Sequence, residues 1–295
     1  MQAYIQSKRK LMEFIAFTAP AVILILLVSE IPFLLNVFYS FTKWNGISNT
    51  VTWIGLDNFK EIFTDDQYFI EAALFTLNYT VVTSIAVNVL AIVLAVVLNK
   101  QLKTKNLLRA LFFIPFVLSL LITSYMWKFI FMKGFSIMYV VTGWEMFQWS
   151  WLGTGNLAFA SVVIVSVWKL VGYSMVIYIA GLQAISSDVL EAAQIDGASA
   201  TQRMFKVILP LLMPAITISV FITITGGLAV FDIPFALTGG GPGTATTGVA
   251  MDIYKAAFLT NRFGYATAKS LIFFIVATTI AIIQVTITKK REVEA

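Results

Sequence analysis

The sequence predicts an all-α membrane protein with six transmembrane helices and both termini in the cytoplasm. Its 295 residues are 59% hydrophobic and only 12% charged, and the mean hydropathy is +0.87. That is more apolar surface than a soluble core of this size can bury. The chain has no cysteine and no histidine, so disulfides, thiolate catalysis, zinc sites and histidine acid-base chemistry are excluded.

Six windows of about twenty apolar residues, the length a helix needs to cross the hydrocarbon layer, supply the predicted spans. They run roughly over residues 14–38, 72–98, 110–131, 157–184, 207–231 and 266–287. The fifth contains Pro210, Pro214 and the Gly226–Gly227 pair, breakers that membrane helices tolerate where neighbouring protein satisfies the backbone. The first follows basic residues 8–10 as a signal peptide would, but no small-residue cleavage site follows it, so we interpret it as a retained anchor.

Basic residues indicate the orientation. They concentrate in the segments that this topology places inside, as the positive-inside rule requires. The clusters are residues 8–10, 100–109, 203–206 and 289–291. The outer segment 39–71 agrees, since its acidic residues outnumber its lysines. Because the cations flank apolar windows, the net charge of +5 does not indicate a nucleic-acid partner.

The polar stretch EAAQIDGASA, residues 191–200, separates the fourth and fifth windows and predicts two short helices joined by a hinge. Asp188 can cap the first helix with Glu191 three residues later, and Gly197 can end that helix in the left-handed conformation. Ser199 and Gln202 form an S-x-x-Q capping box for the second helix. The loop is therefore expected to be folded.

Two functions remain open for this loop from the spacing alone. Ala192 and Ala193 give the first helix a smooth face with little side-chain entropy to lose, which suits close docking on another protein. The alternative is an interfacial helix lying on lipid, although Glu191 and Asp196 are poor partners for anionic headgroups. Surface loops often carry binding residues, but a loop can also do no more than connect two helices.

One signature spans this loop and the start of the fifth window. The pattern E-A-A-x3-G-x9-I-x-L-P is matched by Glu191, Ala192, Ala193, Gly197, Leu209 and Pro210. Val207 stands in place of the isoleucine. The chain therefore resembles the membrane subunits of binding-protein-dependent ABC importers. The resemblance implies a type I importer permease fold with a cytoplasmic coupling helix, within residues 187–200, seated on the ATP-binding subunit.

The resemblance also implies a division of the chain and a coupling site. Residues 1–71 would hold the N-terminal tail, first span and outer loop, 72–287 the transmembrane core with a coupling loop at about 185–206, and 288–295 a cytoplasmic tail. The residues implied in coupling to the ATPase are Glu191, Ala192, Ala193, Asp196, Gly197 and Pro210.

Further stretches are similar to carbohydrate-uptake permeases of the maltose and glycerol-phosphate type. They are WIGLDNFKEIF (53–63), residues 78–80, RALFFIPF (109–116), AGLQAI (180–185) and LTGGGPGTATT (237–247). The resemblance implies a subunit of an ATP-driven importer of an oligosaccharide, in the cytoplasmic membrane of a bacterium or archaeon. It implies as partners a second homologous permease, two ATP-binding subunits that hold ATP and Mg²⁺, an extracytoplasmic solute-binding protein and the lipid bilayer.

The chain itself lacks the sequence of an ATPase. No G-x-x-x-x-G-K-[ST] occurs, and GGGPGTATTG, residues 239–248, lacks the lysine and the strand-to-helix setting of a phosphate-binding loop. We therefore expect a transport subunit that is not an enzyme and binds no cofactor or metal. The glycine run is expected to be a flexible outer loop, which the resemblance puts near the docked solute-binding protein.

A substrate cavity is expected near mid-membrane, lined by the fourth and fifth spans, because transporters place their sites where helices are interrupted. Thr223, Gly227 and Val230 share one face at i, i+4 and i+7, and their register resembles the cavity-lining stretch of maltose-type permeases. Gly226 and Gly227 would leave room for a larger saccharide. Close helix packing explains the same glycines equally well.

Two aromatic and two charged residues are further candidates for this pathway. Phe231 and Tyr173 could stack on sugar faces, although aromatic residues in spans are more often packing or interface residues. Lys169, near the middle of the fourth window, should face the bundle interior or water, where it can pair with a neighbour or meet an anionic substrate. Asp232, at the outer end of the fifth window, is a candidate partner for that lysine or an outer-gate residue.

Two rival classes share parts of this pattern. A proton- or sodium-driven secondary transporter would also show six apolar spans with few buried charges, but Lys169 is the one ionisable residue expected deep in a span, and no carboxylate relay is evident. A membrane enzyme is a weaker alternative, because the sequence offers no obvious nucleophile-base pair or metal site.

Overall fold

The computed structural model describes residues 2–100 and 103–292, and almost all of its regular structure is helical. Besides α-helices it contains π-helical turns (η1, η2, η4, η5) and one 3₁₀ turn (η3). The elements are α1 (Gln2–Ile25), η1 (Leu26–Glu30), α2 (Ile31–Ser40), β1 (Thr42–Lys43), β2 (Thr52–Trp53), α3 (Asp57–Thr64), α4 (Gln67–Leu98), α5 (Lys105–Val117), α6 (Leu120–Phe129), η2 (Ile130–Gly134), α7 (Phe135–Thr142), η3 (Glu145–Gln148), α8 (Gly155–Ala184), α9 (Ser187–Ile195), α10 (Ala200–Arg203), η4 (Met204–Ile208), α11 (Leu209–Leu211), α12 (Met213–Leu228), α13 (Asp232–Leu237), α14 (Val249–Tyr254), η5 (Lys255–Leu259) and α15 (Phe263–Lys289).

Among the described residues, four helical stretches are long and apolar enough to cross a membrane, or up to six if each of two bent helix pairs is one span. The four are Met12–Ser40, Gln67–Leu98, Gly155–Ala184 and Phe263–Lys289. The bent pairs are Lys105–Val117 with Leu120–Thr142, and Ala200–Leu211 with Met213–Leu228. Each predicted apolar window coincides with one of these stretches.

The third window departs from the prediction, because it is not one continuous helix. α5 and α6 meet at an angle of 99°, whereas the sequence predicted breakers only in the fifth window, which bends by 69°. Leu118 and Ser119 are both extended, with ψ of 146° and 136°, and Pro115 lies within the last turn of α5. A proline offers no N–H to the helix ladder and so favours such a break.

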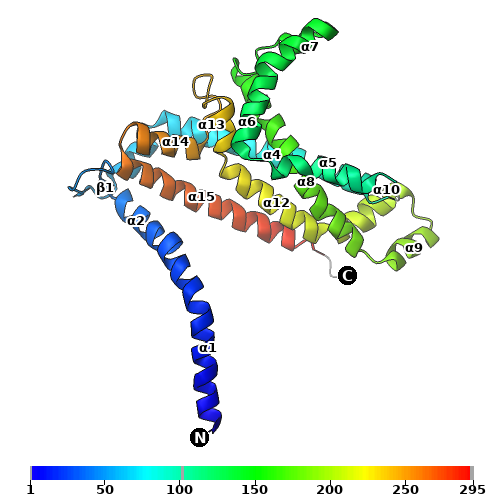
Figure 1. The fold of residues 1–295 in the computed structure, drawn as a ribbon, viewed down its shortest axis with the longest axis horizontal. Coiled ribbons are helices and arrows are strands. Elements are labelled where there is room, and N and C mark those ends of the chain that lie inside the picture. The colour runs from blue at the N-terminus through cyan, green and yellow to red at the C-terminus, as the bar shows by residue number, and fades with distance from the viewer. Residues whose placement is uncertain (1, 101–102, 293–295) are drawn as a thin grey trace. The chain divides into compact units, whose positions relative to one another are not determined.

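The chain divides into two compact units, of which the larger comprises residues 67–252 and 274–295. In this unit α4 packs along α8 and along α12, and α5 packs on α8 (Figure 1). Small residues allow the close approach, as in other membrane bundles. A Cβ atom on Gly172 of α8 would lie 1.9 Å from the carbonyl oxygen of Phe112 in α5, and one on Gly181 would lie 2.7 Å from the Cβ atom of Ala215.

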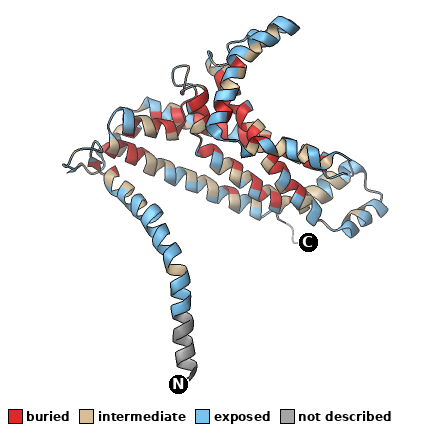
Figure 2. Ribbon diagram, viewed as in Figure 1, coloured by how far each residue is buried: buried red, intermediate tan, exposed pale blue. Residues whose placement is uncertain are grey.

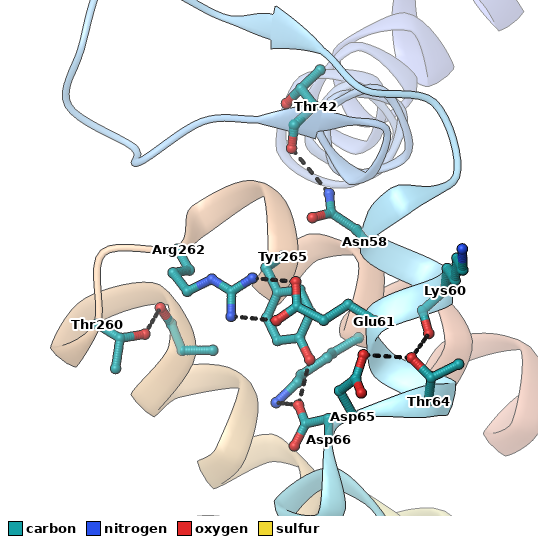
Figure 3. Close-up of polar contacts among 12 residues, drawn as sticks. Thr42, Asn58, Lys60, Glu61, Thr64, Asp65, Asp66, Thr260, Arg262 and Tyr265 are labelled. Carbon is teal, nitrogen blue, oxygen red and sulfur yellow. Dashed lines mark hydrogen bonds and ion pairs between the residues drawn. The ribbon is translucent and has the colours of Figure 1, made fainter.

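The smaller unit comprises residues 1–66 and 253–273. Its antiparallel ribbon pairs Thr42 with Trp53 and Lys43 with Thr52. The buried Asn58 holds the end of α2 to this ribbon, since its Nδ2 donates to the carbonyl oxygen of Ser40 at 2.9 Å. The same Nδ2 donates to the carbonyl oxygen of Thr42 at 3.0 Å (Figure 3).

An ion-pair network joins α3 to the start of α15 within the smaller unit (Figure 3). Arg262 makes a two-bonded contact with Glu61, at 2.8 and 2.6 Å. Lys269 Nζ lies 2.6 Å from Asp66 Oδ2, and the Tyr265 hydroxyl donates to the same carboxylate at 2.5 Å. Because the Glu61 carboxylate accepts from its guanidinium, the pKa of Arg262 is raised above its ordinary value.

Candidate functional site

The polar loop between the fourth and fifth windows forms two capped helices, as the sequence predicted. α9 is preceded by Ser186, whose side chain accepts a hydrogen bond from the backbone N–H of Asp188 at 3.2 Å. The predicted cap at Asp188 is therefore wrong by two residues, because Ser186 has the extended backbone of an N-cap whereas Asp188 is already in the first helical turn. Asp188 there still interacts favourably with the positive end of the helix dipole.

Gly197 ends α9 in the left-handed conformation, with φ of +76°, as predicted. Its N–H donates to the carbonyl of Gln194 at 3.1 Å, and the N–H of Ala198 donates to the carbonyl of Ala193 at 3.0 Å. This pair of bonds is a Schellman motif, which satisfies carbonyls that the end of a helix otherwise leaves free.

The second helix begins with the predicted capping box. Ser199 Oγ accepts from the N–H of Gln202 at 3.3 Å, and Gln202 Oε1 accepts from the N–H of Ser199 at 2.8 Å. Arg203 then reaches back to α9, where its Nη1 donates to Gln194 Oε1 at 3.0 Å. The two helices are thus joined by side chains as well as by the backbone, and Pro210 follows in α11.

The outward surface of this segment combines exposed apolar and acidic side chains. Ile195 at the end of α9 is 86% exposed, and Phe205 after α10 is 64% exposed. Glu191 and Ala192 are also exposed, as are Asp196 and Gly197, whereas Ala193 is half-buried. Exposed large apolar side chains beside unshielded carboxylates suit a protein partner better than water or anionic lipid.

Lys169 is buried in α8, with 5% of its surface exposed. Its ammonium group donates to the carbonyls of Pro115 and Phe116, each at 3.2 Å, and to the carbonyl of Leu118. These oxygens lie at the end of α5, where the break before α6 removes their helical donors. The side chain meets these carbonyls rather than Asp232, since no ion pair joins the two charges among the described residues.

Thr223 and Gly227 share a face of α12 that packs inward, whereas Val230 lies two residues beyond the end of this helix and is also buried. Thr223 of α12 is 3% exposed and Val230 is 7% exposed, and Gly227 is buried too. A Cβ atom on Gly227 would lie 3.0 Å from Thr80 of α4. The glycine therefore permits close packing of α12 on α4, whereas a Cβ atom on its neighbour Gly226 would meet nothing within 4 Å.

The remaining pathway candidates lie near helix ends or in aromatic pairs. Phe231 is half-buried and stacks on Phe235, with ring centroids 5.1 Å apart. Tyr173 is half-buried in α8 and stacks on Phe116 at 4.4 Å. Asp232 begins α13 and is half-buried.

Sequence reasoning missed a polar cluster in the middle of the larger unit. Asn88 of α4 donates from Nδ2 to Thr223 Oγ1 at 3.0 Å, and its Oδ1 accepts from Ser219 Oγ at 2.7 Å and from the Tyr178 hydroxyl. Ser84 completes the cluster through a 2.8 Å contact with Thr223. The available signal was an asparagine inside an apolar window, where a polar side chain needs partners in protein.

Two other expectations require correction. Glu30 lies within the Met12–Ser40 stretch, so Lys169 is not the one ionisable residue inside a span. The glycine-rich segment 239–248, which was expected to be a flexible outer loop, is folded into turns that hydrogen bonds hold together. In it the buried Thr246 donates to the carbonyl of Gly241 at 2.8 Å and contacts Thr238 Oγ1 at 2.7 Å.

Comparisons with known proteins agree on one family. The family described as binding-protein-dependent transport system inner membrane component matches residues 87–293. The chain is 38% identical, over 94% of both sequences, to a probable starch degradation products transport system permease protein, AmyD, of Thermoanaerobacterium thermosulfurigenes. It is also 38% identical to the multiple sugar-binding transport system permease protein MsmF of Streptococcus mutans, covering 89% of this chain and 90% of that one.

The fold is shared with a solved structure. A chain in the crystal structure of a bacterial ABC transporter involved in the import of the acidic polysaccharide alginate has a TM-score of 0.82, covering 98% of this chain and 99% of that one at 21% identity. A second structure, of a bacterial alginate ABC transporter in complex with an alginate pentasaccharide-bound periplasmic protein, gives a TM-score of 0.80 at 20% identity, covering 96% of each chain.

Proposed function

The chain belongs to the family of binding-protein-dependent transport system inner membrane components, and from that premise we propose that it is the permease subunit of an ATP-driven sugar importer. Its substrate is an oligosaccharide, in keeping with the names of its sugar-transporting relatives. It crosses the cytoplasmic membrane of a bacterium or archaeon six times, with both bent helix pairs counted as spans and both termini inside. The excess of basic residues in the inner segments supports this orientation.

The coupling segment, residues 185–206, is the observation that carries this function. It is short, capped at both helix starts, closed by a Schellman motif and clamped by Arg203 on Gln194. Its exposed surface carries Ile195, Phe205 and Glu191. A rigid segment with an apolar and acidic outer surface is what force transmission between two protein subunits requires.

The work is divided among several subunits. Two ATP-binding subunits hold ATP and Mg²⁺ and seat the coupling segment, a second homologous permease forms the other half of the pathway, and an extracytoplasmic solute-binding protein delivers the sugar. No phosphate-binding loop sequence is present in this chain. Hydrolysis is therefore assigned to the partners.

Transport follows from a shift between two populations of the assembly. ATP binding closes the two ATP-binding subunits, the coupling segments move with them, and the bundles tilt from inward-facing to outward-facing. The segment has to be stiff, because a slack connection would absorb the displacement. Glu191 is the residue we assign to a charged or hydrogen-bonded contact with a basic group on the ATP-binding subunit.

The sugar pathway runs along the open side of α12, at Gly226, toward Phe231 and Asp232. Space next to Gly226 supports this assignment, since a side chain there would meet no atom within 4 Å. The opposite side of α12 packs on the other helices of this chain. The buried residues there are Thr223, Gly227 and, just after the helix, Val230. The second permease closes the pathway.

The decisive experiment is reconstitution of the two permeases, the ATP-binding subunits and the solute-binding protein in vesicles. Uptake of labelled oligosaccharide is expected to require ATP and both ATP-binding subunits and to be blocked by vanadate. Ionophores that collapse proton and sodium gradients should leave uptake unchanged. Uptake that survives without ATP-binding subunits and disappears with the ionophores would instead establish the ion-coupled alternative.

A further inference from the structure

The smaller unit contains a cavity of about 740 Å³, a volume within the range of small-molecule sites, about 300–1,000 Å³. All of its lining residues fall within 43–61 and 261–265, so the cavity is formed inside this one unit. Its walls are the antiparallel ribbon with its connecting loop, one side of α3 and the start of α15. Residues 264–269 of α15 are buried (Figure 2), so this wall is a packed part of the fold.

A buried amide of α3 offers an acceptor to this cavity. Asn58 lines the cavity and is only 5% exposed. Its Nδ2 is occupied by the carbonyl oxygens of Ser40 and Thr42, whereas its Oδ1 accepts no hydrogen bond within the described part of the smaller unit (Figure 3). Because a buried amide oxygen without a donor is unfavourable, this atom needs a donor on a molecule that enters the cavity.

The charged side chains on the cavity wall balance. Lys43 and Arg262 are basic, and Asp57 and Glu61 are acidic, so the wall carries no net charge. Arg262 uses two of its N–H groups on Glu61, which leaves three of its five donors for another acceptor. A wall that has both signs of charge and no net charge complements a neutral polar ligand better than an anion or a cation.

The rest of the wall combines hydroxyl groups with an aromatic ring that is held in place. Thr50 and Thr52 line the cavity, and each hydroxyl can donate as well as accept. Trp44 adds apolar surface to the wall. Its indole ring stacks on Tyr39 with centroids 4.3 Å apart, and its Nε1 donates to the carbonyl of Ser48 at 2.8 Å. The wall therefore needs no rearrangement of this ring to receive a ligand.

We propose that this cavity binds a neutral saccharide on the outer side of the membrane, with residues other than those of the pathway along α12. The proposal rests on the proposed function, which supplies the sugar and the orientation. A sugar ring has hydroxyl groups that donate and accept, and C–H groups that pack on aromatic rings. Asn58 and Asp57 are the acceptors for its hydroxyl groups. Lys43 and Arg262 are the donors, and Trp44 packs on its C–H groups.

Protection of an introduced cysteine tests the site in the assembled permeases and ATP-binding subunits, with the solute-binding protein omitted so that only free sugar is present. The chain has no cysteine of its own, so Thr50→Cys puts a single thiol of this chain on the cavity wall. The matched control is Asn49→Cys, because the neighbouring Asn49 does not line the cavity.

Maltotetraose is expected to slow the reaction of Thr50→Cys with a membrane-impermeant maleimide at least about fivefold once the site is mostly occupied. The reaction of Asn49→Cys should keep its rate, and the acidic trigalacturonate should protect neither position. The proposal is overturned if millimolar maltotetraose gives no protection, if both positions are protected equally, or if trigalacturonate protects better than maltotetraose.

A second pair of variants tests the chemistry of the wall in the Thr50→Cys background. Asp57→Asn keeps the shape of the side chain but weakens an acceptor, and it is expected to raise the maltotetraose concentration for half-maximal protection about three- to tenfold. Asp65→Asn should leave that concentration unchanged, because Asp65 does not line the cavity. An unchanged concentration in Asp57→Asn, or an equal rise in both variants, would contradict the proposal.

The site and the proposed function fail in different ways. Absence of protection while uptake still depends on ATP overturns this site alone. Uptake that is independent of ATP overturns the proposed function, whether or not maltotetraose protects position 50.

Discussion

Replacing Gly197 with proline should separate ATP hydrolysis from sugar uptake. Gly197 has φ of +76° and its N–H donates to the carbonyl of Gln194. Proline fixes φ near −65° and has no N–H, so it can neither adopt this conformation nor form this bond. The Schellman motif that ends α9 would be lost, and with it the defined angle between α9 and α10.

The magnitude follows from these two losses. A backbone conformation forced into an unfavourable region costs about 1–3 kcal/mol, and the lost hydrogen bond contributes about 0.5–1.5 kcal/mol. The segment is therefore destabilised by about 1.5–4.5 kcal/mol when both losses are combined. Since a Cβ atom on Gly197 would meet nothing within 4 Å, the cost stays local and the membrane bundle should assemble normally.

The assay compares two rates in reconstituted vesicles, ATP hydrolysis and uptake of labelled sugar. Gly197→Pro is expected to retain hydrolysis while uptake per ATP falls at least about tenfold. Gly143→Pro is a matched control, because Gly143 also ends a helix in the left-handed conformation, with φ of +69° and nothing within 4 Å, but lies outside the coupling segment. Normal uptake per ATP in Gly197→Pro, or an equal loss in both variants, would refute the reasoning.

Three further substitutions have distinct expected outcomes. Glu191→Ala should weaken the contact with the ATP-binding subunit by about 2–5 kcal/mol, which co-purification would measure, and unchanged transport would contradict the assignment. Lys169→Met leaves buried carbonyls without a donor, each at a cost of about 1–3 kcal/mol, so thermal stability in detergent should fall. The KM of a neutral sugar should stay the same, and a changed KM would instead indicate substrate contact. Asn88→Leu removes the oxygen that accepts hydrogen bonds from Tyr178 and Ser219, and it should destabilise the bundle by about 1–3 kcal/mol. Thermal unfolding measures this loss, and an unchanged unfolding temperature would show that the polar cluster does not stabilise the bundle.

The sequence by itself determined the features that depend on neighbours within one helical turn or on the thickness of the membrane. The apolar windows follow from the length of a spanning helix, and all of them coincide with helical stretches. The capping box at Ser199 and the left-handed Gly197 are local backbone chemistry, since their hydrogen bonds join residues no more than five apart. The first cap was misplaced because Ser186 and Asp188 are both competent caps, and only the backbone angles distinguish them.

Only the tertiary structure decided which faces meet and which polar groups find partners. The carbonyls that Lys169 binds lie more than fifty residues earlier in the chain, at the end of α5. Pro115 favours a break there, but the sequence does not show that Lys169 meets the carbonyls that the break frees. Asn88 likewise meets Tyr178 and Ser219 across three helices. In an apolar helix the hydrophobic pattern no longer distinguishes inside from outside, because lipid and protein core are equally apolar. The face of each span that packs is therefore set by small residues and hydrogen bonds between helices, which appear only once the helices are assembled.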